Sequence, residues 1–141
     1  MRGDDPLARA RGQCADMDYV PAAEVRVIDG ETLRYGRERI RILGIDAPET
    51  ENRARCDAER QLAAKATTTL TNIIMGKRLE VERHGKDRFG RTLAYIRIGG
   101  AEIGEMLIMA NVAVRWGDGA KEALERVASD RRPDWCARLA R

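Results

Sequence analysis

The stretch Arg-Ile-Arg-Ile-Leu-Gly-Ile-Asp-Ala-Pro-Glu, residues 39–49, says more about the fold than any other part of this sequence. Basic and apolar side chains alternate before the glycine. This predicts a strand with one face buried and with both arginines, at positions 39 and 41, facing out. Pro48 has no N–H to continue a ladder of hydrogen bonds, so the strand should end before it. The stretch therefore delivers two acids, Asp46 and Glu49, to the end of a half-buried strand.

Segments with strand and helix patterns surround this stretch in an order that indicates one fold class. The predicted strands are 20–28, 32–35, 39–45, 79–83 and 92–98, with 112–116 as a last extended piece. The predicted helices are 57–75, which has an apolar stripe and is bounded by Asp57 as N-cap and Gly76 as stop, and the shorter 102–110 and 120–129. This order predicts a β-rich α+β fold: a five-stranded OB-fold barrel with one long helix between strands 3 and 4 and short C-terminal helices.

The chain is long enough for one domain and has no pattern that requires a second. Residues 1–19 are polar and unpatterned and are expected to form a flexible N-terminal arm. The barrel domain is then expected over 20–136, with a C-terminal tail at 137–141. A monomer is the default expectation for this chain of 141 residues.

The composition excludes some classes of partner and leaves others open. The net charge of +3 and the pI near 9.0 are compatible with an anionic partner but do not demand one. No apolar run approaches the ~20 residues that span a bilayer, so no membrane partner is expected. The first residues have no apolar signal core, which fits a protein that stays inside, one whose leader has been removed, or a sequence that begins late.

The cysteines and the single histidine argue against a zinc site. Cys14, Cys56 and Cys136 contain no C-x-x-C pair, and His84 is the only imidazole. His84 is expected in a polar loop, without a catalytic role. A disulfide between Cys56 and Cys136 is one arrangement, expected only in an oxidising compartment, and three free thiols are the other.

Carboxylates and arginines supply the groups that phosphodiester hydrolysis needs. A water must be deprotonated and aimed, and fixed positive groups must meet the charge that develops on the phosphate. Glu31 and Asp46 lie at turn or strand ends that a meander can bring together, and such oxygen donors suit calcium. Arg41 and Arg91 can each grip two phosphate oxygens. Taken singly, each of these residues has an ordinary explanation as a turn cap or a solvated charge; their conjunction favours the chemistry.

Three motifs in this order resemble the staphylococcal-type thermonuclease family. They are Val-Ile-Asp-Gly-Glu-Thr at 27–32, Arg-Ile-Leu-Gly-Ile-Asp-Ala-Pro-Glu at 41–49 and Asp-Arg-Phe-Gly-Arg-Thr-Leu-Ala-Tyr at 87–95, and the resemblance runs over 25–114. It implies an OB-fold nuclease that uses calcium to cut single-stranded or locally melted DNA, and RNA, to products with 3′-phosphates. It also implies export to the periplasm or beyond.

The resemblance assigns roles to particular residues by motif. It implies that Glu31, Asp46 and the main-chain oxygen of Ala47 bind the metal. It implies that Glu49 is the general base and that Arg41 and Arg91 hold the phosphate.

The sequence departs from the family pattern at three places. Glu31 stands where the family usually has Asp, and Ala47 replaces a common hydroxyl residue. The family's nucleotide-contacting tyrosines have no clear match around Trp116. Two alternatives therefore stay open: a non-catalytic OB-fold module that binds nucleic acid, and a structural barrel whose charges all lie on the surface.

Overall fold

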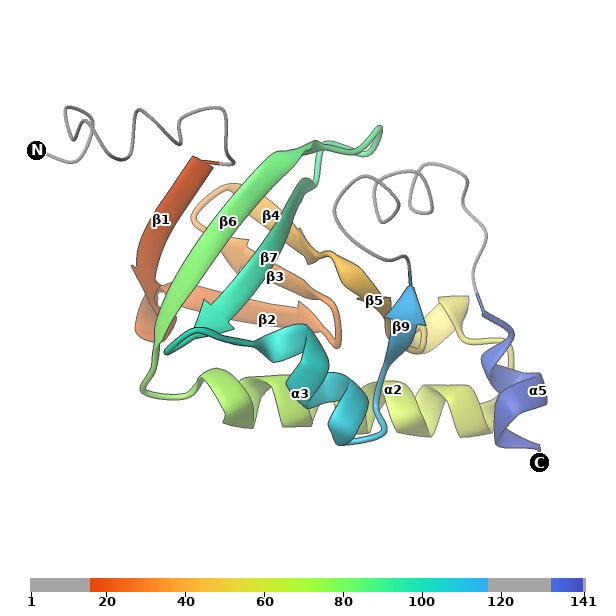
Figure 1. The fold of residues 1–141 in the computed structure, drawn as a ribbon. Helices are drawn as coiled ribbons and strands as arrows, with labels where there is room; N and C mark the ends of the chain where they lie inside the picture. The colour runs from red at the N-terminus through yellow and green to blue at the C-terminus, as the bar shows by residue number, and fades with distance from the viewer. Residues whose placement is uncertain (1–15, 117–132, 141) are drawn as a thin grey trace, which may run out of the picture.

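A computed structural model describes residues 16–116 and 133–140 of the chain (Figure 1). The strands are β1 (Asp16–Pro21), β2 (Val25–Asp29), β3 (Thr32–Tyr35), β4 (Glu38–Ile42), β5 (Gly44–Asp46), β6 (Arg78–Lys86), β7 (Thr92–Ile98), β8 (Ala101–Glu102) and β9 (Val114–Trp116). The helices are the 3-10 turns η2 (Ala22–Glu24) and η3 (Glu51–Arg53), and α2 (Asp57–Ile74), α3 (Ile103–Met109) and α5 (Trp135–Leu139). Within these residues no helix is long and apolar enough to cross a membrane.

The strands form a curled sheet that closes over the long helix (Figure 1). Its order is β1-β6-β7-β4-β3-β2, with β8 added on β7, and a small second sheet pairs β5 with β9. The expected meander of β2, β3 and β4 is antiparallel throughout. The chain then passes through helix α2, and β7 pairs parallel to β4. This order confirms the predicted β-rich α+β class and the OB-type barrel, extended by strands that the sequence did not signal.

The core lies between the concave side of the sheet and helix α2. The apolar stripe of α2 faces the sheet as its spacing predicts, with Ala66, Leu70 and Ile74 buried. The sheet contributes Leu33, Ile40, Ile42, Leu79, Val81 and Ile96, all with no more than 1% of their surface exposed. The N-cap residue is Cys56 rather than the predicted Asp57, and Gly76 adopts a φ of +71° as expected beyond a helix end.

The prediction for residues 39–45 is wrong in one respect that matters for the site. The segment is two strands, β4 and β5, because the chain bends at Gly44, where φ is +86°. Arg41, expected to face solvent, is 2% exposed. The side chain is covered by Glu31, Asp46 and the main chain at the bend between β4 and β5, which meet its guanidinium.

Other differences come from pairings between distant segments. Residues 16–19, expected to belong to a flexible arm, form part of β1 and pair with β6. His84 lies inside β6 and not in a loop. The helix α5 crosses the expected boundary between residues 136 and 137. The rest of the arm and the predicted helix 120–129 lie outside the described residues.

The side chain of Glu38 on β4 forms hydrogen bonds with residues on β6 and β7. Its Oε1 accepts from Arg83 Nη2 at 2.9 Å, and its Oε2 accepts from Arg83 Nε at 2.8 Å and from Thr92 Oγ1 at 2.7 Å. The two-pronged bond from Arg83 is the main cause of a lowered pKa at Glu38. One side chain thus joins β4 to both β6 and β7.

We expect Glu38→Gln to lower the free energy of unfolding by about 1–2 kcal/mol at pH 7, because a charge-assisted pair is lost. The folded pKa lies below the ordinary 4.5, so this contribution is present above that pH and is lost as the pH falls through the folded pKa. Denaturant titrations at pH 7 and near pH 3 should show the difference between variant and wild type shrinking in acid. Glu24→Gln, at an exposed site on η2, is the control. A difference that is constant with pH would contradict the assignment.

Candidate active site

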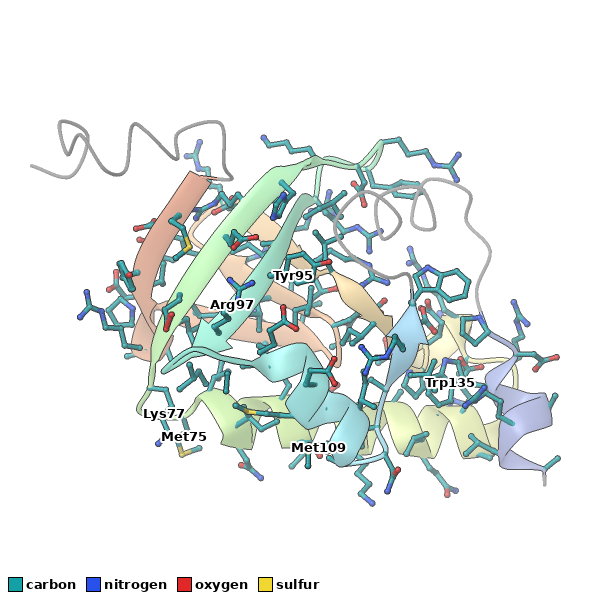
Figure 2. All side chains as sticks on the ribbon, viewed as in Figure 1. Met75, Lys77, Tyr95, Arg97, Met109 and Trp135 are labelled. Atoms are coloured by element: carbon teal, nitrogen blue, oxygen red, sulfur yellow. A yellow bond between two sulfur atoms is a disulfide. The ribbon has the colours of Figure 1, made fainter. Side chains whose placement is uncertain are left out.

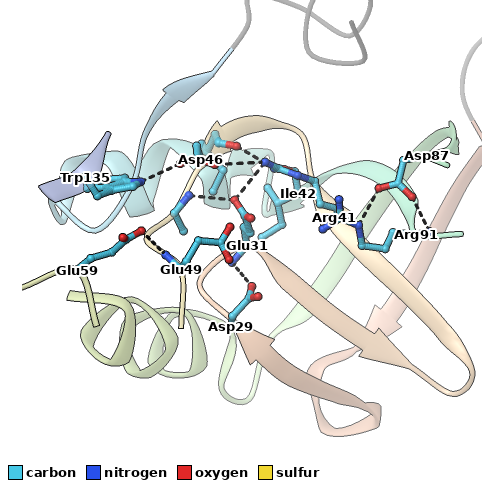
Figure 3. Close-up of polar contacts among 12 residues, drawn as sticks. Asp29, Glu31, Arg41, Ile42, Asp46, Glu49, Glu59, Asp87, Arg91 and Trp135 are labelled. Carbon is cyan, nitrogen blue, oxygen red and sulfur yellow. Dashed lines mark hydrogen bonds and ion pairs between the residues drawn. The ribbon is translucent and has the colours of Figure 1, made fainter. Parts of the chain in front are cut away.

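The guanidinium of Arg41 lies at the centre of a buried polar cluster (Figure 3). Its Nη2 is 3.1 Å from Glu31 Oε2 and 3.9 Å from Asp46 Oδ1. Its Nη1 donates to the main-chain oxygen of Ile45 at 2.8 Å and also to that of Ile42. Arg41 therefore joins an acid on the β2–β3 turn to an acid at the end of β5, and holds the bend between β4 and β5.

One donor of this guanidinium has no acceptor. Arg41 Nε is buried and makes no hydrogen bond. A buried unpaired donor costs about 1–3 kcal/mol, and such a group in a native fold is a candidate for contact with a ligand. An anionic oxygen is the partner that a guanidinium N–H accepts best.

Glu31 lies on the tight turn between β2 and β3, which approaches the middle of α2. Its Oε2 accepts from the Ala47 N–H at 2.9 Å, and its own N–H donates to Asp29 Oδ1 at 2.9 Å. A Cβ at Gly30 would lie 2.6 Å from the Ala66 Cβ, so only glycine lets the turn approach α2 this closely. Burial, and then the nearby charge of Glu31, raise the pKa of Asp29.

Asp46 ends β5 and is 1% exposed. Besides Arg41, it meets a residue from the C-terminal helix: its Oδ2 accepts from the indole N–H of Trp135 at 2.8 Å. The carboxylate is thus held between a cation on one side and a neutral donor on the other (Figure 3). Its orientation is fixed by two elements that are far apart in the sequence.

Glu49 is half-buried in the loop that follows β5. Its main-chain N–H donates to Glu59 Oε2 at 2.9 Å, and the other oxygen of Glu59 accepts from the Arg55 N–H at 2.9 Å. Glu59 is 3% exposed and lies in the first turn of α2. One buried carboxylate therefore ties the loop that carries Glu49 to the helix.

Arg91 lies at the head of β7, next to the strand that carries Arg41. Leu93 is the register partner of Arg41, and Arg91 comes two residues before it. Its Nε donates to Asp87 Oδ2 at 2.7 Å, and Asp87 Oδ1 accepts the N–H groups of Phe89 and Arg91, each at 2.9 Å. Burial by itself raises the pKa of Asp87, but these hydrogen bonds from Arg91 and the loop outweigh it and lower the pKa.

The structure brings some of the expected site residues together and keeps others apart. Glu31 and Asp46 meet at Arg41, and the main chain of Ala47 bonds to Glu31. Arg91 pairs with Asp87 and not with the acids at Arg41. His84 lies outside this cluster, with its Nε2 at 2.5 Å from Glu82 Oε2.

The oxygen atoms around the Arg41 guanidinium are of the kind that calcium prefers as ligands. They are carboxylate and main-chain oxygens, with no thiolate or imidazole among them. Two acids, Glu31 and Asp46, face one guanidinium, which leaves an excess of negative charge that a divalent cation would balance. In the described part of the chain, no three His, Cys, Asp or Glu side chains are grouped closely enough to hold a metal by themselves. A cation here would therefore need main-chain oxygen and water as further ligands.

Sequence reasoning missed several residues that position the site. Glu59 has a local signal, because it stands three residues after the N-cap Cys56, where a capping-box acid is expected. Asp29 and Asp87 lie within the quoted motifs, but no supporting role was assigned to them. Trp135 has no signal at all, since the segment around it is not periodic and its partner Asp46 is distant in sequence.

Comparison with known proteins shows the family of the chain. The family model described as staphylococcal nuclease homologue matches residues 39–132. The thermonuclease of Staphylococcus intermedius is 33% identical over 106 residues, which cover 70% of this chain and 60% of that protein. The thermonuclease of Staphylococcus hyicus is 35% identical over 96 residues, which cover 63% of this chain and 55% of that protein. The match thus spans little more than half the length of these relatives, and over that span the chain belongs to the staphylococcal nuclease homologue family.

Proposed function

We propose that the chain is a calcium-dependent nuclease, an endonuclease that hydrolyses single-stranded or melted DNA, and RNA, to 3′-phosphate products. The supporting observation is the buried guanidinium of Arg41 between Glu31 and Asp46. Family membership and the thermonuclease names of the relatives support the same class of reaction. Open OB-type barrels commonly bind single strands, which supports the choice of substrate.

In this proposal each residue has a distinct task. Glu31, Asp46 and the Ala47 carbonyl would hold calcium, which when bound supplies positive charge to the phosphate. Glu49 takes a proton from the attacking water, held in place by the bond from its N–H to Glu59. Arg41 contributes its unpaired Nε–H to a phosphate oxygen.

Arg91 would hold the phosphate from the neighbouring strand. The hydrogen bond from its Nε to Asp87 uses one edge of the guanidinium and fixes its orientation. A guanidinium has further N–H groups on its other edge, which suit a phosphate oxygen. The loop from Asp87 to Arg91 therefore orients the Arg91 guanidinium before a substrate binds.

One feature favours a second candidate, a non-catalytic module that binds nucleic acid. Glu31 is one methylene longer than the family's usual Asp, and its Oε2 already accepts from Ala47 and contacts Arg41. A carboxylate engaged in this way has less capacity to bind a metal. This candidate is expected to bind single strands in a salt-sensitive manner without turnover.

We expect Glu49→Gln to reduce calcium-dependent cleavage of denatured DNA by about 10²–10⁴-fold, because the amide cannot take a proton. The measurement compares the initial rates of the variant and the wild type with calcium and with chelator. Glu80→Gln, a matched change at a half-buried acid on β6 far along the barrel, should keep the wild-type rate.

Negligible cleavage by the wild type in both calcium and chelator would rule out the nuclease. Retained single-strand binding in that protein would then support the binding module. Equal cleavage by Glu49→Gln and the wild type would remove Glu49 from the role of base.

We expect Glu31→Asp to raise the calcium-dependent rate several-fold and to lower the free energy of unfolding by about 1–3 kcal/mol. Shortening the side chain withdraws it from the Ala47 N–H and from Arg41, which frees the carboxylate for a cation but leaves buried partners unpaired. Rate assays and denaturant titrations measure the two effects separately. The control is Glu80→Asp, which shortens an acid that accepts the Gly100 N–H at 3.2 Å. An unchanged or lower rate in Glu31→Asp would show that the extra methylene of Glu31 does not lower the calcium-dependent rate.

A further inference from the structure

The C-terminal helix α5 is fastened to the body of the protein by a covalent bond. Cys136 in α5 forms a disulfide with Cys56, the N-cap of α2, and joins positions 80 residues apart. This confirms the first of the two arrangements expected from the sequence. Figure 1 shows α5 lying against the start of α2. A helix of five residues is too short to be stable alone, so its place depends on this link and on its packing.

The residue next to the disulfide points into the candidate active site. Trp135 is 5% exposed, and its indole N–H donates to Asp46 Oδ2 (Figures 2 and 3). Asp134, at the N-cap of α5, accepts from the Ala137 N–H at 3.1 Å and orders the turn that presents the indole. Helix α5 therefore carries a group that contacts one of the proposed metal ligands.

The bond acts on the orientation of Asp46. One oxygen accepts the neutral indole N–H, and the other is turned toward Arg41 at 3.9 Å. Without the indole donor, the carboxylate could rotate further toward the guanidinium and pair with it through both oxygens. Partners of this kind, which orient a metal ligand, typically change metal affinity or activity by about 10–100-fold when they are removed.

We propose that Trp135 is a positioning residue for Asp46, and that the Cys56–Cys136 disulfide holds it in that position. The proposal rests on the proposed function, since it assigns Asp46 to the metal. It implies that the protein reaches full calcium affinity only when the disulfide is formed. Such a dependence suits a protein that works in an oxidising compartment.

Reduction offers a direct way to release the helix. A dithiol reductant transfers two electrons and two protons to the disulfide, which becomes two thiols while the reductant closes into a cyclic disulfide. The covalent link between α5 and α2 is then lost. The indole of Trp135 should leave Asp46 for part of the time, because only non-covalent packing remains.

The test uses the full chain with Cys14→Ser, so that no third thiol can exchange with the pair. On this background, Trp135→Phe removes the N–H and keeps a ring. The matched control is Arg138→Ala in the same helix, which removes a cation stacked 5.8 Å from the Trp135 ring but leaves the indole N–H intact. A Cys56→Ser/Cys136→Ser variant reproduces the reduced state without reductant.

The first measurement uses calcium-free protein and needs no activity. Exchange of the Trp135 indole N–H with solvent, followed by NMR and assigned by its absence in Trp135→Phe, should speed up at least about 10-fold in the double serine variant and in reduced protein. It should change little in Arg138→Ala. Exchange at the same rate in oxidised and reduced protein would show that the disulfide does not hold the indole, and would overturn that part of the proposal.

The second measurement is calcium affinity by calorimetry, together with kcat and KM for denatured DNA. Trp135→Phe should weaken calcium binding by about 10-fold and lower kcat at subsaturating calcium, with the KM for DNA nearly unchanged. Thermal unfolding of each variant shows whether the fold is kept, and high calcium should restore kcat in a folded variant. Arg138→Ala should match the wild type.

The possible failures point to different conclusions. A folded Trp135→Phe protein with wild-type calcium affinity, beside an active wild type, would overturn the positioning role and leave the nuclease standing. A wild type that neither binds calcium nor cleaves DNA would overturn the proposed function and the positioning role with it. In that case the exchange measurement would still report whether the disulfide holds the indole.

Discussion

The buried guanidinium of Arg41 is the interaction on which the rest of the site depends. Burying a charge costs on the order of several kcal/mol unless it is paired and hydrogen-bonded. Here two carboxylates and two main-chain oxygens meet it, and they come from the β2–β3 turn and from both sides of the bend at Gly44. One cation therefore holds the β2–β3 turn and the bend between β4 and β5 in a single geometry. The same acids would repel each other in its absence.

Around Arg41, contacts with neighbouring residues hold each of the other proposed functional groups in place. Gly30 lets the turn that carries Glu31 touch α2, and Glu59 holds the loop that carries Glu49. Trp135 fixes Asp46, and Asp87 fixes Arg91. Catalysis benefits from groups that are oriented before the substrate arrives, because little reorganisation is then needed in the transition state. The longer acid at position 31 is one of the places where the sequence departs from the family pattern.

Much of the fold could be predicted because the sequence patterns that indicate its strands and helices are local. The strands at 32–35 and 92–98 have the predicted bounds, and the helix from Asp57 ends one residue earlier than expected. In each case a run of apolar side chains at period 2 or 3.6 meets one face of the core. The strand at 16–21 was missed because its residues have no such pattern, and it exists through pairing with β6. Helix α5 was missed for the same reason, since it depends on the disulfide and on α2.

The sequence by itself indicated the meander of β2, β3 and β4, the long helix, and the acids and arginines that we propose for the site. The tertiary structure decided where Arg41 points, which cysteines pair and what lies behind Asp46. Alternation along a strand indicates the two faces of a sheet but not what packs against each face. Here the β2–β3 turn and the bend into β5 bring acids and main-chain oxygens onto the face of β4 that bears Arg41. The partners of Arg41 and Asp46 lie in segments that come together only when the barrel closes. No local pattern encodes a contact of that kind, because its energy depends on the burial that the whole fold creates.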